Sequence, residues 1–265
     1  MYCSCFGSIS VSALPTSAYI RTLSAHGCLV YEFSRRDRQG EGLVHVGCDV
    51  TDEKQVQEAV RQVTDAEGRI DIVVNCAGFG ISGAVEYTAT ADAVRQMDVN
   101  FFGLVRVNRA VLPVMHAQGS GRIVNISSVA APASIPFQAY YSASKAAIND
   151  YTQALANEVR PYGITVCAVM PGDIRSGFTE ARSKSCEGDD VYGGRIARSV
   201  AVMEKDEQNG MAPEAAARTI VKVALKKGRV KPCYAIGFSY KFLVLLDSLL
   251  PCRTVRWLLG ILYGK

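Results

Sequence analysis

Three side chains within one short stretch could carry out acid–base chemistry: Ser128, Tyr141 and Lys145. Tyr141 and Lys145 are four residues apart in a stretch rich in helix formers, which places both on one face of a helix. A phenol of ordinary pKa, about 10, is a poor base at neutral pH, but a nearby ammonium group favours the phenolate. Such a pair also arises by chance. Ser128, at the end of an expected strand, favours a functional interpretation.

The elements around these residues are expected to be a strand followed by a helix. Residues 122–127 are mostly apolar and rich in β-branched types, and helical periodicity begins at Tyr140 and continues to Val159. The same alternation recurs along the chain. Further strands are expected at 28–34, 43–50, 70–75 and 164–170, and further helices at 18–27, 52–68, 90–115 and 213–228. Thr51 is the expected cap of the helix at 52–68, and a bend is expected at Pro113 in the helix at 90–115.

This alternation predicts an α/β fold, a doubly wound parallel sheet in a single domain over residues 1–265. The expected strands are continuously hydrophobic, which is typical of parallel strands covered by helices on both faces. Ligands bind such sheets at the carboxyl ends of the strands. Asp49, Asn75, Ser128 and the turn at 171–179 all follow strand ends and are expected to lie together.

Composition excludes several classes of function. The 265 residues are 49% hydrophobic and carry a net charge of +4 without a dense basic block, so no nucleic-acid partner is expected. Nine scattered cysteines do not resemble a disulfide framework, and with three histidines no metal site is expected. The N-terminus lacks the positive charge of a signal peptide, and we expect a cytoplasmic protein.

Taken together, the motifs between Ala18 and Ser239 resemble the short-chain dehydrogenase/reductase family, particularly NADP-preferring carbonyl and hydroxysteroid-type members. The similar motifs are Asp49 in CDVTD, NCAG from Asn75, Asn100 in DVNFFG, Ser128, the Tyr141–Lys145 pair and Pro171-Gly172. The resemblance implies hydride transfer between a nicotinamide and a carbonyl or alcohol. It also implies catalytic roles for Asn100, Ser128, Tyr141 and Lys145, with Tyr141 as the acid/base, Lys145 lowering its pKa and Asn100 anchoring a water.

The resemblance further implies a cofactor site built from several strand ends, in which Tyr141 and Lys145 also take part. At the tip of the strand at 28–34, Ser34, Arg35 and Arg36 suit a 2′-phosphate, whereas an acidic residue there would repel it. The expected cofactor is therefore NADP(H). The other residues implied in its binding are Asp49, Val50, Asn75, Ala77, Gly78, Pro171, Gly172, Ile174 and Ser176.

The N-terminal residues 1–17 depart from the family. Alignment places the TGxxxGxG loop over Ile9–Thr16, where Ser10, Leu14 and Thr16 replace the three glycines. Glycine allows the backbone to approach the pyrophosphate closely at the helix N-terminus. Two hypotheses stay open, an NADP(H)-dependent oxidoreductase and a catalytically impaired scaffold that acts as a binding or interaction protein.

Two further segments also have alternative interpretations. The polar residues 175–210 could form a mobile lid or a pair of surface helices. Residues 234–265 are apolar and expected to be helical, but Lys241, Asp247 and Pro251 interrupt any membrane span. They could cover the pocket and pack on another subunit of a homo-oligomer, or lie on a membrane surface as a peripheral contact. Either alternative favours a hydrophobic small-molecule substrate, a ketone or secondary alcohol of steroid or lipid type.

Overall fold

A computed structural model describes residues 8–11, 16–37, 39–40 and 42–263, and within them the chain forms one main parallel sheet. Its strand order is β3-β2-β1-β4-β6-β7-β9, and every neighbouring pair is parallel. The strands of this sheet are β1 Ser8–Val11, β2 Val30–Ser34, β3 Leu43–Gly47, β4 Ile72–Asn75, β6 Gly121–Ile126, β7 Ile164–Pro171 and β9 Cys233–Ile236. A separate short pair joins β5 Ile81–Ser82 to β8 Ser183–Lys184.

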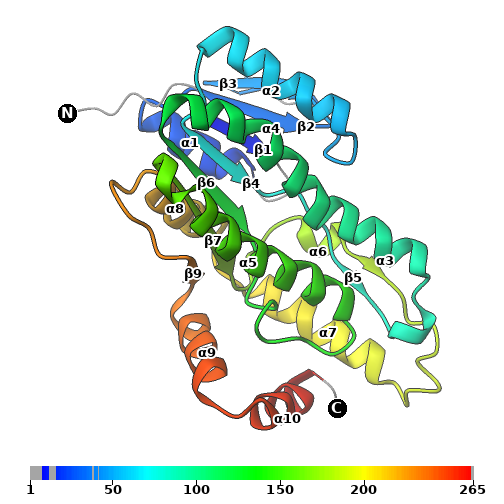
Figure 1. Cartoon of the computed structure of the whole chain (residues 1–265). Coiled ribbons are helices and arrows are strands. Elements are labelled where there is room, and N and C mark those ends of the chain that lie inside the picture. The colour runs from blue at the N-terminus through cyan, green and yellow to red at the C-terminus, as the bar shows by residue number, and fades with distance from the viewer. Residues whose placement is uncertain (1–7, 12–15, 38, 41, 264–265) are drawn as a thin grey trace.

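Helices cover both faces of the sheet, which confirms the doubly wound fold (Figure 1). Successive residues of the central strands alternate between two cores. In β4, Val73 packs with α2, α4 and α5, whereas Ile72 and Val74 pack with α1 and α8. The helices are α1 Thr16–Ala25, α2 Glu53–Glu67, α3 Thr90–Met97, α4 Gly103–Gln118, α5 Ala139–Val159, α6 Phe178–Ala181, α7 Arg195–Gln208, α8 Pro213–Ala224, α9 Phe238–Leu249 and α10 Cys252–Tyr263.

The helix boundaries correct two expectations. The cap of α2 is Asp52 and not Thr51, because the Asp52 carboxylate accepts from the backbone N–H groups of Lys54 and Gln55 and its charge suits the positive end of the helix. The region from Thr90 onward is broken by a π-helical turn at Asp98–Phe102, while α4 continues through Pro113. The irregularity therefore lies beside Asn100, not at the proline.

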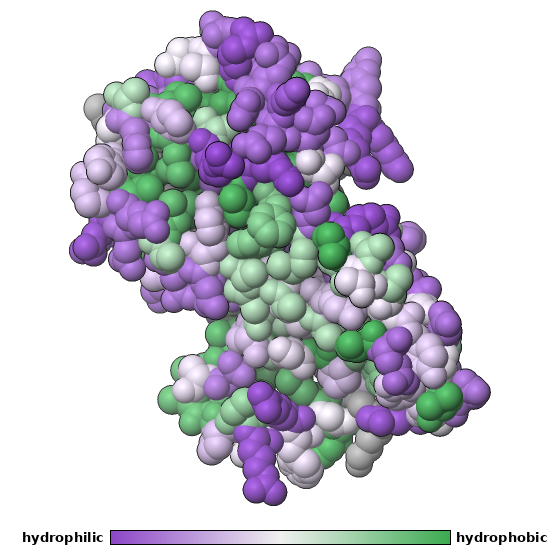
Figure 2. Space-filling view, turned by 45° about the vertical axis from the view of Figure 1, so that its right-hand side comes forward, coloured by the Kyte–Doolittle hydropathy of each residue, from purple (hydrophilic) through white to green (hydrophobic). Residues whose placement is uncertain are grey.

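The C-terminal segment is only partly helical, which corrects the expectation for 234–265. Residues Tyr234–Ile236 belong to β9, which extends the sheet beyond β7. The two helices that follow, α9 and α10, extend away from the sheet and form one end of the molecule (Figures 1 and 2). We call residues 238–263 the C-terminal helix pair.

The N-terminal segment joins the centre of the sheet. β1 lies between β2 and β4 with its register fixed on both sides, as in Val11 opposite Phe33 and Asn75. The eight residues aligned with the glycine loop, 9–16, therefore belong to different elements. Ser10 lies in β1 and Thr16 begins α1, whereas Leu14 lies outside the described residues.

Candidate active site

Two neighbouring cavities lie at the carboxyl ends of the strands. The tyrosine cavity, lined by Tyr141, Lys145 and Ser128, has a volume of about 120 Å³. The arginine cavity, lined by Arg35 and Arg36, has a volume of about 620 Å³. Residues Gly78, Phe178 and Arg182 line both cavities. The two cavities therefore share a wall at these three residues.

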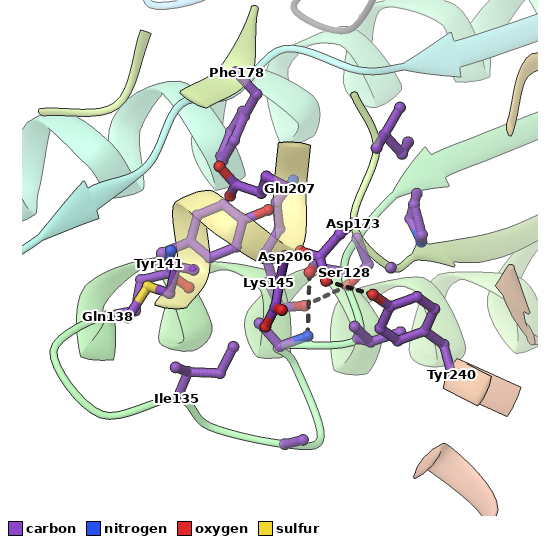
Figure 3. Close-up of a pocket in the computed structure, with 18 of the residues that line it drawn as sticks. Ser128, Ile135, Gln138, Tyr141, Lys145, Asp173, Phe178, Asp206, Glu207 and Tyr240 are labelled. Carbon is purple, nitrogen blue, oxygen red and sulfur yellow. Dashed lines mark hydrogen bonds between the residues drawn. The ribbon is translucent and has the colours of Figure 1, made fainter. Parts of the chain in front are cut away.

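Tyr141 is a protonated phenol that can donate into the tyrosine cavity. It lies in the first turn of α5, and Ser128 follows the end of β6. Burial raises the pKa of Tyr141 to about 12, although a hydrogen bond with Ser128 and the charge of Arg182 act in the opposite direction. At neutral pH the Tyr141 phenol is therefore protonated, and it can donate its proton to a stronger base that forms beside it. Figure 3 shows Tyr141 with Ser128, Lys145 and Glu207 around the cavity.

Lys145 lies over the Tyr141 ring and holds the end of β6. Its Nζ is 5.7 Å from the ring centroid and donates to the Ile126 carbonyl over 2.9 Å. Burial lowers the pKa of Lys145 to about 8. The role that the resemblance implies for this ammonium group, lowering the pKa of Tyr141, stays a prediction.

Gly78 allows the close approach of this lysine to Asn100. A Cβ at position 78 would lie 3.1 Å from Asn100 Oδ1 and 3.6 Å from Lys145 Nζ. The Asn100 amide is engaged with protein: Nδ2 donates to the Phe79 carbonyl and to Ser144 Oγ, both at 3.0 Å, and Oδ1 accepts from the Phe79 N–H at 2.9 Å. Asn100 is absent from the walls of both cavities. Its side chain therefore positions the chain after Gly78.

Asn75 also lies outside the cavity walls, in a buried amide network. Its Nδ2 donates to Asn108 Oδ1 at 2.8 Å and to Asn125 Oδ1 at 2.9 Å, and Asn125 donates to Thr152 at 2.9 Å. This network joins β4, α4, β6 and α5 below the cavities. The residues that follow Asn75 do reach the cavity walls: Cys76 lines the tyrosine cavity, Ala77 and Phe79 line the arginine cavity, and Gly78 lines both.

The arginine cavity brings together the residues expected at the adenosine end of a cofactor. Ser34, Arg35, Arg36, Asp49 and Val50 all line it. The Asp49 carboxylate accepts from the N–H and hydroxyl groups of Thr51, at 3.0 and 2.8 Å, and lies 3.9 Å from Arg35 Nη1.

The acidic residue of β2 is turned away from this cavity. Glu32 is fully buried, accepts from Ser34 Oγ at 3.0 Å and pairs with His45 Nδ1 at 2.8 Å. The two arginines are thus the charged groups that β2 and its turn present to the cavity wall. A negatively charged phosphate suits this wall.

The turn after β7 reaches the tyrosine cavity. Pro171, Gly172, Ile174 and Ser176 line it, as expected for residues at a strand end. Gly172 is required for packing, because a Cβ there would lie 2.1 Å from the Tyr240 ring of α9. The turn therefore connects the sheet to the C-terminal helix pair.

Sequence reasoning missed a buried ion pair in the shared wall. Arg182 follows α6 and pairs with Glu207 of α7, and the two side chains are 1% and 10% exposed. Glu207 also accepts from the Thr179 hydroxyl at 2.6 Å. Arg182 Nε and Nη1 are buried without a hydrogen-bond partner among the described residues. No spacing within 175–210 signals this contact, since the partners are 25 residues apart in different elements.

The C-terminal helix pair covers one end of the tyrosine cavity, which agrees with one of the two interpretations of 234–265, but its polar contacts had no signal in the sequence. The Tyr240 hydroxyl donates to Asp173, and the Tyr263 hydroxyl donates to Asp206 Oδ2 over 3.1 Å (Figure 3 shows the first). Burial raises the pKa of Asp173, opposed by this hydrogen bond. Apolar side chains such as Ile135, Leu243 and Leu259 complete the lining. The cavity therefore suits a molecule with both polar and apolar parts.

The residues present suit a nicotinamide dinucleotide. The arginine cavity offers cations and hydroxyls, Gly78 leaves room at the junction, and Arg182 presents unpartnered donors where the two cavities meet. The tyrosine cavity supplies a protonated acid at the other end. The arrangement can therefore hold an extended, negatively charged ligand and deliver a proton at one end of it.

Comparison with known proteins agrees with this description. A family model for short chain dehydrogenases matches residues 29–187, more than half of the chain. The protein therefore has the Rossmann-like α/β fold of an oxidoreductase family.

Individual relatives cover nearly the whole chain. A 3-ketodihydrosphingosine reductase of Bacteroides thetaiotaomicron is 38% identical over 250 residues, 91% of each chain. A probable short-chain type dehydrogenase/reductase of Helicobacter pylori is 30% identical over 85% of each. A crystal structure of a short-chain dehydrogenase from Streptomyces avermitilis matches with a TM-score of 0.81 and 28% identity, covering 92% of this chain and 93% of that one. The chain belongs to the short-chain dehydrogenase/reductase family.

Proposed function

We propose that this protein is an NADP(H)-dependent reductase that interconverts a ketone and a secondary alcohol on a lipid-like substrate. The observation that carries the proposal is the protonated Tyr141, hydrogen-bonded with Ser128 in a cavity that adjoins the arginine cavity. The name of the Bacteroides thetaiotaomicron relative, a 3-ketodihydrosphingosine reductase, supports a lipid-like ketone.

Tyr141 is the proposed acid, and Ser128 its partner. In reduction, the Tyr141 hydroxyl donates its proton to the substrate carbonyl oxygen while the Ser128 hydroxyl donates a hydrogen bond to the same oxygen. When bound, NADPH supplies the hydride that adds to the carbonyl carbon. The Ser128 Oγ also accepts from the Ala130 N–H at 3.1 Å, which fixes the position of the hydroxyl.

Lys145 and the residues around the junction are proposed to support this transfer. The Lys145 ammonium stabilises the phenolate that remains after Tyr141 has given up its proton, because the two groups lie within one helical turn in a buried site. Asn100 keeps Phe79 and Gly78 in place beside Lys145 and acts as a positioning residue.

The cofactor is proposed to lie with its adenosine in the arginine cavity. Ser34, Arg35 and Arg36 would hold the 2′-phosphate, and Asp49 and Val50 would lie against the adenine. At the other end, Ile174 and Ser176, with Pro171 and Gly172, would hold the carboxamide of the nicotinamide. Ala77 and Gly78 would support the chain of phosphates between them.

The reductase proposal is tested by adding NADPH and 3-ketodihydrosphingosine to the full-length protein. We expect loss of NADPH absorbance together with formation of the secondary alcohol, identified by mass spectrometry. A short water-soluble ketone is the matched comparison and is expected to react with a lower kcat/KM, because it leaves Leu243 and Leu259 without contacts. Absence of alcohol from every ketone tried would overturn the proposal.

Cofactor preference gives a separate prediction. Replacing Arg35→Ala and Arg36→Ala together is expected to weaken NADPH binding about 10–100-fold, since each arginine can make a charge-assisted hydrogen bond with phosphate. NADH binding should change only a few-fold. Isothermal titration calorimetry with both coenzymes measures the two effects. Arg61→Ala is the control, because Arg61 is exposed and paired with Glu58 and Asp65, outside the arginine cavity. NADH binding as tight as NADPH binding in the wild type would contradict the prediction.

The scaffold function is the second candidate, and the observation that favours it is the absence of glycine at Ser10, Leu14 and Thr16. A ligand that binds only the native state must raise its melting temperature. If neither NADPH nor NADH raises the Tm of the wild type, the chain is a binding protein with the fold of a reductase. A rise with NADPH excludes that alternative.

A further inference from the structure

The inner face of the C-terminal helix pair forms part of the wall of the tyrosine cavity. Tyr240 and Leu243 of α9 and Leu259 and Tyr263 of α10 all line this cavity. The hydrogen bonds of Tyr240 with Asp173 and of Tyr263 with Asp206 fix the pair to the rest of the molecule. With the pair in this position, the cavity of about 120 Å³ is well below the roughly 300–1,000 Å³ of ordinary small-molecule pockets. Movement of the pair would enlarge this cavity, because four of the lining side chains belong to the pair.

The outer face of the same helices is apolar and exposed. Along α9, Phe238, Phe242, Leu245 and Leu249 recur at helical spacing and are between 52% and 93% exposed. No residue of α9 is buried. On α10, Trp257, Leu258 and Leu262 add to this surface. The helix pair forms the lower end of the molecule in Figure 2, where green side chains lie among purple ones. Exposed apolar side chains gathered on two neighbouring helices are typical of a contact site.

The charges beside this surface favour a negatively charged partner. Lys241, Arg253 and Arg256 are exposed, and Asp247 is the one acidic residue between Phe238 and Tyr263. Basic residues next to apolar and tryptophan side chains are typical of helices that lie in the interface of an anionic bilayer. A second copy seated here by a two-fold axis would instead place the same basic residues on both sides of the contact, where they repel.

We propose that the outer face of the C-terminal helix pair binds the surface of an anionic lipid bilayer. The contact is peripheral, because no helix within the described residues is long and apolar enough to cross a membrane. The pair then contacts lipid on one face and the tyrosine cavity on the other. A displacement of α9 and α10 into the bilayer would open the cavity directly toward lipid. This route for the substrate rests on the proposed function, whereas the binding to membranes does not.

The experiment uses the full-length protein without cofactor or substrate, so its outcome is independent of the reductase activity. Vesicles of phosphatidylcholine with and without phosphatidylglycerol are titrated, and binding is followed by sedimentation and by fluorescence of Trp257, the single tryptophan. We expect binding to the phosphatidylglycerol vesicles, a blue shift of the Trp257 emission, and weaker binding at high salt. Phe242→Glu with Leu245→Glu should weaken partitioning by about 10–100-fold.

Two further variants separate the possible outcomes. Val94→Glu with Val191→Glu adds the same charge at valines that are similarly exposed, 61% and 67%, but outside the helix pair, and should leave partitioning within about twofold of the wild type. Arg253→Gln with Arg256→Gln should weaken binding to anionic vesicles only. Failure of the wild type to bind either vesicle overturns the proposal. The proposal is also overturned if the Phe242→Glu, Leu245→Glu variant binds vesicles as well as the wild type does but has a smaller oligomeric mass in solution. A second copy of the chain would then cover this face in the wild type.

Discussion

Replacing Tyr141 with phenylalanine is expected to lower kcat/KM for ketone reduction by about 10²–10⁴-fold, the range for a lost general acid. The substitution removes the phenolic proton and the hydrogen bond with Ser128, and leaves the ring in contact with Phe178. Because the lost group acts on the reacting oxygen, the decrease should appear in kcat. Steady-state kinetics with NADPH and a lipid-like ketone measure it.

The neighbouring tyrosine provides a matched control for this variant. Tyr140 lies on the same helical turn, but its hydroxyl reaches the Val85 carbonyl over 3.4 Å and does not line the tyrosine cavity. Tyr140→Phe should therefore stay within a few-fold of the wild type. The Tyr141→Phe protein should keep the rise in Tm with NADPH, which separates lost chemistry from lost binding. Activity of Tyr141→Phe close to that of the wild type would show that another group donates the proton.

The sheet and the residues at its strand ends could be predicted because their signals are local. Parallel strands buried on both faces appear as continuous apolar runs, and the described structure has a strand that overlaps each of the five expected ranges. The strand β9 was missed because its apolar signal merges with that of the helix after it. Its four residues, Cys233–Ile236, stand directly before an apolar helix, so nothing in hydrophobicity separates strand from helix there.

The motif residues were found, but the positions of their side chains depend on tertiary packing. Asn75 and Asn100 stand where the family motifs place them, yet their amides bond with protein groups and neither side chain lines a cavity. No signal in the sequence indicated the pairing of Arg182 with Glu207. In a polar segment, a charged residue in a buried ion pair cannot be distinguished from a charged residue on the surface. Such contacts follow from how α6 and α7 pack, which no local pattern records.

This hidden pair should have a large effect on stability. Replacing Glu207 with leucine is expected to lower the free energy of unfolding by about 3–5 kcal/mol, the usual cost of removing one partner from a buried ion pair. The Arg182 guanidinium, with a side chain 1% exposed, would then stay buried without its carboxylate, and the Thr179 hydroxyl would lose its acceptor. Urea denaturation followed by circular dichroism measures the difference.

A second ion pair between the same two regions is the matched control. Lys184 and Glu204 also join the segment after α6 to α7, but their side chains are 36% and 30% exposed. Because water screens this pair, Glu204→Leu should cost no more than about 1 kcal/mol. Equal losses for the two variants would contradict the assignment of the large effect to burial.

The double variant Arg182→Met with Glu207→Leu distinguishes charge from packing. Two apolar side chains of similar size remove both buried charges at once, so the double variant should be more stable than Glu207→Leu alone and close to the wild type. Its response to NADPH then shows whether Arg182 serves the ligand as well as the fold. Arg182 Nε and Nη1 are buried donors in the wall between the two cavities, so we expect the rise in Tm with NADPH to be smaller in the double variant. If NADPH raises the Tm of the double variant as much as that of the wild type, Arg182 does not serve the ligand and only holds α7 against the cavity.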